Sequence, residues 1–410
     1  MNKTQDTKSK ERKLIRNLSI GMGLSLSAVI VLLVFSYKPK TVIPNPKLPN
    51  PNAFDTFKIA YSQLLDSAKI VYVLADTHNS GKKEDREYTN SEKVAILKEN
   101  LPALKTLREG LNQEYGNPPV RSVSNMEAYL SNFKSLGELL TLEAKLKEEK
   151  GDWKGAMDSS LDCIQMGIKI PHGNGIIGGL AGISIQKDGR RSCDKCVKHL
   201  TAFEAKSVIK RLDETMRTQF KWESTMQEEA WQMRSILLND KKDLSIFQYP
   251  VADNYDRRSK EWIARVKLPY SGHSIPADTG IDFFGFNKMI TDGYDRFFCT
   301  SVLGRTKNAI LMFELALQAH KMEKGRYPTT LQELSPTYLK DLPIDPFAFT
   351  GTFRYRLDGA KYCLYSVGPD GKDDGGKAID NPKAPGSITD LRAKYRVKME
   401  SNGDIVSGVN

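Results

Sequence analysis

The chain has 410 residues, with 61 Lys or Arg against 50 Asp or Glu and a formal net charge of +11 at pH 7. The cations are dispersed among acids along the chain, so its basic clusters are typical of solvated faces, and nucleic acid is not an expected partner. Anionic lipid headgroups or wall polymers suit such patches better. The length is sufficient for two domains.

An uncharged stretch follows a basic cytoplasmic tail, residues 1–17. It runs from Leu18 to Phe35 and makes roughly 27 Å of helix at about 1.5 Å per residue, close to a hydrocarbon core of about 30 Å. Because the basic excess precedes the stretch, the positive-inside rule places the N-terminus in the cytoplasm. The sequence therefore predicts a transmembrane anchor at residues 18–36 of a single-pass protein in a bacterial cell membrane, with the bulk of the chain extracytoplasmic (periplasmic). The alternative is a cleaved signal peptide, but the end of the stretch has no small-x-small cleavage site.

A linker at residues 37–52 and a mainly helical domain at residues 53–298 are expected next. The linker contains five prolines, which favour extended backbone, so we expect a semi-rigid spacer. In the helical domain, apolar side chains recur with a helical period, and Thr201 with Glu204 forms a capping box at a helix start. Residues 241–298 are less regular, and we expect a long, partly ordered connection there.

One segment of the helical domain resembles the turn of a tetratricopeptide helical hairpin. The resemblance lies in small residues and one aromatic at set positions: Ala144, Gly151, Asp152, Trp153, Ala156 and Cys163. Small residues let two helices approach, and the aromatic side chain fills the turn. Only one copy is evident, whereas such arrays need about three repeats, so the segment predicts a helical hairpin. A peptide-binding groove is the alternative interpretation.

Two short motifs suggest cofactor chemistry but lack its context. Cys193 and Cys196 form a CxxC followed by His199, without the second ligand pair of a zinc site or the βαβ pattern of a redox motif. A local disulfide or two unpaired thiols is the preferred interpretation, and the odd total of five cysteines leaves at least one unpaired or intermolecular. Residues 173–178 match GxGxxG but follow a helix, which favours a loop entering a closely packed helix over a dinucleotide site.

The character of the chain changes at residues 299–410, the segment called the C-terminal module below. A helix of about 25 residues is expected to end at Gly325 and to be followed by an extended corner at Leu342–Phe347. Residues 353–357 and 362–367 alternate like two antiparallel strands, joined by a turn at Asp358-Gly359. The predicted fold class is α+β: a transmembrane helix, an all-α domain, then a module with a long helix and a small antiparallel sheet.

The order of motifs in this module resembles the globular domain of the major pseudopilin of type II secretion systems. The motifs are a long helix, KGRYPTTLQEL, YLKDLPIDPF, FRYRL, YCLYSVGPDGKDDGG and a final Gly403-Asp404-Ile405-Val406. Each motif alone is weak, but the combination in this order is fairly specific. The resemblance covers about the last quarter of the chain and says nothing of residues 53–298.

The resemblance implies a calcium-binding loop, because the corresponding loop of that family binds calcium. Carried over to matching positions, the implied ligands are Ser366, Val367, Asp370, Asp373, Asp374 and Asp404. Calcium prefers six to eight hard oxygens at about 2.3–2.6 Å, and glycines let carbonyls turn inward. Its role would be structural. The alternative is a Gly/Asp-rich turn without a metal, since an insertion at residues 377–402 separates the loop from Asp404.

The N-terminal half departs from that family. A pseudopilin is processed after a glycine and carries a glutamate five residues later, whereas here Gly21 is followed by Leu26 and Gly23 by Ala28 at that place. We therefore expect neither prepilin processing nor assembly as a pilus subunit.

Enzyme signals are poor, because no GxSxG, HExxH or P-loop motif occurs and the five histidines are scattered. The leading hypothesis is a non-enzymatic, membrane-anchored extracytoplasmic structural or interaction protein that carries a calcium-stabilised pseudopilin-like module and has protein partners in the envelope. One alternative is an accessory component of a type II secretion or type IV pilus-like machine. Another is an envelope hydrolase with an unrecognised site. A small-molecule ligand is not identified by the sequence.

Overall fold

The computed structural model describes residues 43–67, 70, 88–122, 128–239, 248–270, 286–381 and 394–410. The predicted cytoplasmic tail (1–17) and anchor (18–36), the first part of the linker and the middle of the insertion at 377–402 lie outside these residues.

The predicted transmembrane architecture is contradicted for the part of the chain that the structure describes. No helix there combines the length and the apolarity that crossing a membrane requires. Even the longest helix, Phe286–Lys324, carries charged side chains throughout, including Asp292, Arg305 and Glu314. The fold class is corrected accordingly, and so are the single-pass topology and the periplasmic location that depended on the predicted span.

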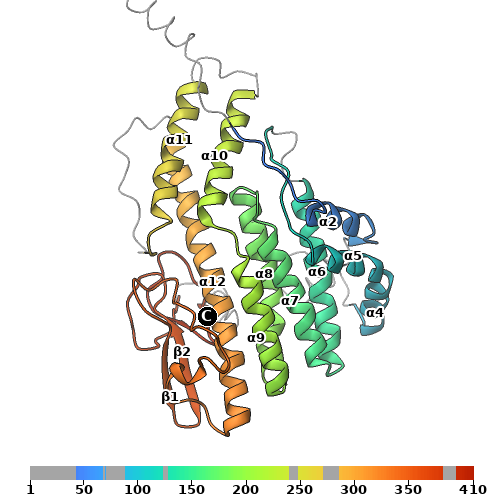
Figure 1. The fold of residues 1–410 in the computed structure, drawn as a ribbon, viewed down its shortest axis with the longest axis vertical. Helices are drawn as coiled ribbons and strands as arrows, with labels where there is room; N and C mark the ends of the chain where they lie inside the picture. Colours follow the sequence, from blue (N-terminus) through green and yellow to red (C-terminus); the bar gives the residue numbers. More distant parts are fainter. Residues whose placement is uncertain are drawn as a thin grey trace, which may run out of the picture.

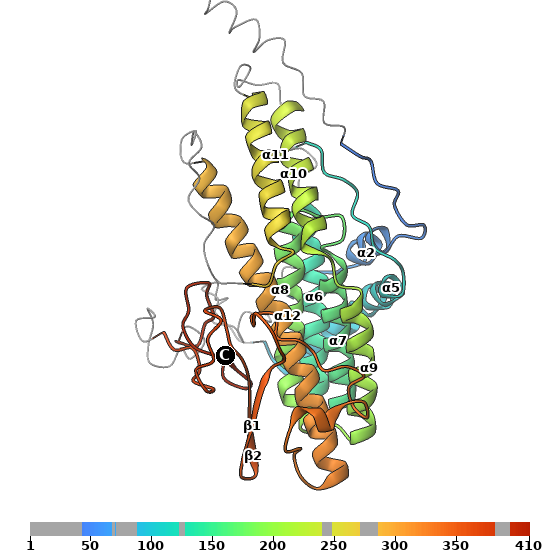
Figure 2. The same ribbon diagram turned by 60° about the vertical axis from the view of Figure 1, so that its left-hand side comes forward.

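The described residues form an array of helices with a small sheet on one side (Figure 1). The helices are α2 (Ala53–Ser62), α4 (Asn90–Glu99), α5 (Leu101–Leu111), α6 (Ala128–Glu149), α7 (Trp153–Lys169), α8 (Ile176–Val197), α9 (Ala202–Arg217), α10 (Trp222–Asn239), α11 (Gln248–Arg265) and α12 (Phe286–Lys324). Helices α6 to α9 run side by side at the centre, α2, α4 and α5 lie at one edge, and α12 lies at the other (Figures 1 and 2).

The predicted hairpin is confirmed as the pair α6 and α7. Gly151 adopts a φ of +73° in the turn, and the Asp152 side chain caps α7 by accepting a hydrogen bond from the amide of Gly155 at 2.9 Å. The loop around Gly173 leads into α8, which packs closely on α7, as the sequence predicts for the GxGxxG segment.

Residues 241–298 contain more helix than the sequence predicts. Helix α11 begins at Gln248 and places Pro250 in its first turn, where the missing N–H has no intrahelical partner to lose. Helix α12 begins at Phe286 and has 39 residues, so it is longer than expected. It ends at the predicted point, because Gly325 takes a φ of +74° and its amide bonds the carbonyl of Lys321.

The predicted hairpin of strands is also confirmed. Strands β1 (Arg354–Asp358) and β2 (Lys361–Ser366) pair antiparallel, and Asp358 faces Lys361 across a two-residue turn. A third strand, β3 (Ile405–Val406), pairs antiparallel with β2, giving the order β1-β2-β3. This pairing carries the end of the chain back beside the start of the loop that follows β2.

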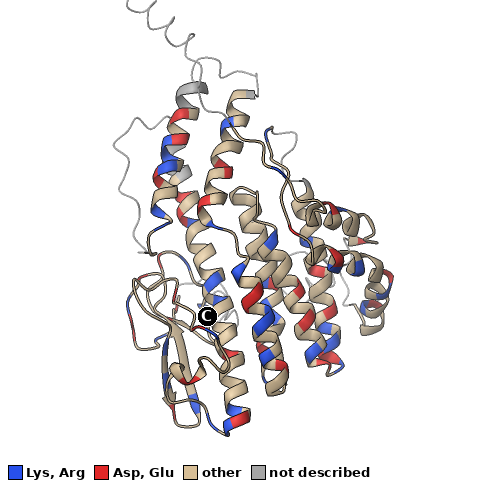
Figure 3. Cartoon of the chain, in the orientation of Figure 1, with Lys and Arg blue, Asp and Glu red and all other residues tan. Residues whose placement is uncertain are grey.

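One hydrophobic core runs from α7 through α12 into the C-terminal module. Phe313 of α12 packs edge-on against Phe353 with ring centroids 5.3 Å apart, and Tyr270 packs on Phe347 at 4.9 Å. A second cluster lies around α2, α5 and α6, with Phe57 and Phe133 fully buried. Lys, Arg, Asp and Glu alternate over the described helices, as the dispersed charges of the sequence predict (Figure 3).

Candidate functional site

The loop after β2 and the residue before β3 form the predicted ligand region. Asp404 is fully buried next to β3, and a bridge between Ala378 and Asp404 holds it against the far end of the loop. Its carboxylate accepts backbone N–H groups from Gly376 at 2.7 Å and from Asp374 at 3.4 Å. The structure therefore places the Asp404 carboxylate against the end of the loop, at the amides of Asp374 and Gly376.

The charge of Asp404 is unfavourable in this position. Burial, together with the charges of Asp373 and Asp374, raises the pKa of Asp404 to about 6 against the opposing effect of the two loop amides. Three carboxylates thus lie near enough to repel one another. A cation beside Asp404 would relieve that repulsion.

Two further predicted ligands take different places. One Asp370 oxygen accepts the amide of Gly403 at 3.2 Å, so this side chain lies beside the residue that precedes Asp404. Asp373 instead pairs with Arg354 at 3.1 Å and accepts the hydroxyl of Tyr365 at 3.0 Å. Of the acids in the loop, Asp370 is thus tied beside Asp404, whereas Asp373 is engaged by the sheet.

Ser366 and Val367 are fixed by a residue that the sequence interpretation missed. The hydroxyl of Ser366 donates to one oxygen of Asp345 at 2.8 Å, and the amide of Val367 donates to the other at 3.0 Å. The amide of Phe347 adds a third hydrogen bond at 3.0 Å. Asp345 is 3% exposed, and its burial raises its pKa against these hydrogen bonds. The sequence signal that could have indicated this role is an acid placed between two prolines, in Pro343-Ile344-Asp345-Pro346.

Asp345 also fixes the corner of the module, which in the structure comprises residues 342–349 and carries two exposed apolar side chains. Ile344 is 71% exposed and Phe349 is 78% exposed, on either side of the buried Asp345 and Phe347. The corner is tied to the strand end by Asp345 and closed by a bridge between Ile344 and Thr352. It therefore presents large apolar groups to solvent on a fixed backbone.

The donor set is suitable for calcium, though it is incomplete in side chains. Within the described residues, no three His, Cys, Asp or Glu side chains are grouped to hold a metal ion. Calcium also accepts backbone carbonyls, and Gly368, Gly371 and Gly375 adopt φ values near +70° in this loop, which is the conformation that turns of this kind need. A calcium ion here would therefore be held mainly by loop carbonyls, with Asp404 and Asp370 as the carboxylates whose places the structure gives.

The two cysteines of the CxxC segment are buried thiols. All five cysteines are free thiols, and Cys193 and Cys196 are buried in α8. Burial raises the pKa of Cys196 to about 12 and that of Cys193 well above its ordinary value, so neither is a thiolate near pH 7. His199 stacks on Trp153 with ring centroids 3.9 Å apart, so its ring packs on the hairpin turn.

No family model, curated protein or solved structure matches this chain. The pseudopilin resemblance of the C-terminal module therefore stays a prediction based on the order of its motifs.

Proposed function

We propose that this chain is an interaction protein whose helical part presents a calcium-stabilised, pseudopilin-like module to a partner protein. The observation that carries the proposal is the fixed corner of the module, residues 342–349. Scattered exposed apolar side chains are ordinary on protein surfaces. Here two of them, Ile344 and Phe349, flank a buried carboxylate that holds their backbone, and a rigid apolar contact loses little entropy on binding.

The continuous core supports this proposal. The sheet and the corner pack on α12, and α12 packs on α8 and α9 along the same core. In the described residues, the corner and the helical part therefore belong to one packed core. A protein packed in this way suits the role of holding the module in place for a partner.

Calcium would act on the same module as a structural ion. Asp404 and Asp370 are the carboxylates that would hold it, together with loop carbonyls, and the ion would neutralise the charge of Asp404 that burial makes unfavourable. The loop begins at the end of β2, where Ser366 and Val367 bond Asp345. An ordered loop would thus stabilise the corner through Asp345.

Comparative co-purification tests the interaction. The tagged wild-type chain, Phe349→Ser and Phe203→Ser are used as baits in the presence of calcium, and recovered proteins are quantified by mass spectrometry. Phe203 in α9 is 83% exposed and lies outside the module, so it matches Phe349 in residue type and exposure. Both variants are expected to fold, because surface substitutions change stability by only about 0.5 kcal/mol.

We expect a partner that is recovered with the wild type and with Phe203→Ser and is lost with Phe349→Ser. Equal recovery with all three baits, or recovery no greater than with an untagged control, would contradict the proposed role of the corner.

A further inference from the structure

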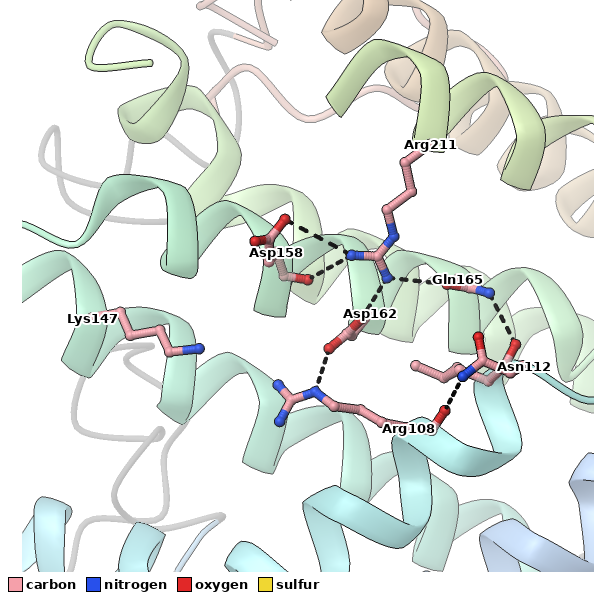
Figure 4. A pocket seen from close by; sticks show the side chains of 8 residues that line it. Arg108, Asn112, Lys147, Asp158, Asp162, Gln165 and Arg211 are labelled. Atoms are coloured by element: carbon pink, nitrogen blue, oxygen red, sulfur yellow. Dashed lines mark hydrogen bonds and ion pairs between the residues drawn. The ribbon is translucent and has the colours of Figure 1, made fainter. Parts of the chain in front are cut away.

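A pocket of about 450 Å³ lies in the helical part, on elements that the proposed function does not use. It is lined by Arg108, Leu111, Asn112, Lys147, Asp158, Asp162, Gln165 and Arg211, which come from α5, α6, α7 and α9 (Figure 4). Its volume falls within the range of small-molecule sites, which is roughly 300–1,000 Å³.

Two arginines are positioned in this pocket by one buried carboxylate. Asp162, only 7% exposed, accepts Nε of Arg108 at 2.7 Å with one oxygen and Nη2 of Arg211 with the other. Gln165 accepts a second hydrogen bond from Arg211 at 3.1 Å. Figure 4 shows both guanidinium groups meeting at Asp162 from opposite helices. The two planar groups are thus held in fixed orientation before any ligand arrives.

Both arginines keep donors for a ligand. Within the described residues, Nη1 of Arg108 and Nε of Arg211 meet no acceptor, and about a third of each side chain is exposed. Lys147 points its ammonium group toward Arg108 across the pocket (Figure 4). A guanidinium edge and an ammonium facing one space are the arrangement that binds a carboxylate.

The charges around the pocket leave one positive charge uncompensated. Its lining contains three cations (Arg108, Lys147, Arg211) and two carboxylates (Asp158, Asp162), which gives +1. Behind the lining, Glu143 bonds Arg108 and Lys147, and Lys154 bonds Asp158 at 2.6 Å, so these two charges cancel. The balance therefore favours a single negative charge over a dianion.

Behind the lining, Glu143 is held in its charged form. Burial opposes the charge of Glu143, but hydrogen bonds from Arg108 and Ser159 and the charge of Lys147 lower its pKa overall. Its charge therefore keeps Arg108 and Lys147 in place beside the pocket.

We propose that this pocket binds a small organic acid, whose single carboxylate is held by Arg108, Arg211 and Lys147 and whose further polar group meets either Asp158 or Asn112, which lie on opposite sides of the pocket (Figure 4). Hydroxy acids and amino acids have this chemistry, since a hydroxyl or ammonium group donates to the amide or carboxylate oxygens of those two residues. The sparse apolar lining, with Leu111 alone, disfavours a long hydrocarbon chain.

Calorimetric titration of the full chain tests the site, with glycolate, glycine, succinate and inorganic phosphate as probes. The variants are Arg108→Gln, Arg211→Lys and Asp158→Asn, and the matched control is Arg217→Gln, an exposed arginine of α9 paired with Asp213 outside the pocket. Circular dichroism establishes that each variant is folded. If Arg108→Gln does not fold, Asp158→Asn decides, because its side chain is 42% exposed and its loss leaves Asp162 in place.

We expect glycolate or glycine to bind the wild type and Arg217→Gln alike, and to bind Arg108→Gln and Arg211→Lys about tenfold or more weakly, because a guanidinium donor held in fixed orientation is lost. Asp158→Asn should bind glycolate more tightly, since a competing negative charge is removed. If the network only holds the helices together, none of the probes binds the wild type, and this result would overturn the proposal. Tighter binding of phosphate or succinate than of the monocarboxylates would also overturn it.

Discussion

At the scale of single residues, the approach of α7 and α8 depends on a missing side chain. A Cβ at Gly182 would lie 2.5 Å from the carbonyl oxygen of Gly167 and 2.8 Å from the ring of Pro171. The first of these neighbours is backbone, which cannot move aside as a flexible side chain can. The spacing of the central helices is therefore set by glycine, as the small residues in the sequence suggest.

Replacing Gly182 with alanine should destabilise the chain by about 1–3 kcal/mol, the usual effect of overpacking a core. Gly293→Ala is the control, because Gly293 lies in α12 with nothing within 4 Å of an added Cβ. That control should be neutral or more stable by about 0.5–1 kcal/mol, since alanine favours helix. Urea unfolding followed by circular dichroism measures both. Equal effects of the two substitutions would refute the close approach.

Asp345 shows which residues of the site could not be predicted. The acidic positions of the loop follow from the motif order, because Asp370, Asp374 and Asp404 are recognisable in the sequence. The role of Asp345 depends on a hydrogen bond across 21 residues to Ser366, and no local pattern specifies that distance. Local signals therefore predicted the acids of the loop but not the carboxylate that fixes its start.

At the scale of elements, local patterns predicted boundaries well where capping and turn residues mark them. The capping box at Thr201 and the stop at Gly325 are observed, and the turn predicted at Asp358-Gly359 lies one residue later, at Gly359-Ala360. Helix α11 was missed, because its mixed aromatic and charged residues show no clear period and Pro250 resembled a helix breaker. Its burial against α10, through tertiary contacts such as that of Asp256 with Arg234, has no local signature.

The contact of α12 with α8 and β3 contains partly buried charges. It therefore predicts that the free energy of unfolding depends on pH. Glu314 accepts the hydroxyl of Ser407 after β3, and Asp194 and Lys198 from α8 and Lys307 from α12 lie near it. Burial raises the pKa of Glu314 from 4.5 to about 7, and the charge of Asp194 adds to this effect. Burial likewise lowers the pKa of Lys307 to about 8.

The sign of the effect follows from the raised pKa. The folded state keeps the proton of Glu314 to higher pH than the unfolded chain, so its contribution lowers stability as pH rises from about 4.5 to about 7. Glu314→Gln removes this loss. We expect the variant to gain stability relative to the wild type across that window and to keep the gain at higher pH, as measured by urea unfolding at a series of pH values.

The control is Glu99→Gln, a substitution of an exposed glutamate. A difference between Glu314→Gln and wild type that is constant with pH would contradict the burial of this charge.

At the scale of the whole molecule, the α12 helix joins the C-terminal module to the helical array in one continuous core. The sequence predicted a helical region and a small antiparallel sheet, but the packing between them is non-local and could not be inferred. The pocket at Asp162 also arises only in the tertiary structure, because its residues are spread from Arg108 to Arg211 along the chain. Sequence patterns indicated none of these contacts.

Calcium-dependent melting of the full chain tests the central claim, that the C-terminal module is stabilised by calcium bound at Asp404. Wild type and Asp404→Asn are melted in calcium and in chelator, because asparagine keeps the shape of the carboxyl group and removes its charge. Calcium at about 100 times its Kd should stabilise the wild type by about 2.7 kcal/mol and raise its Tm, with no rise in the variant. A wild-type Tm that is the same in calcium and in chelator would contradict the claim.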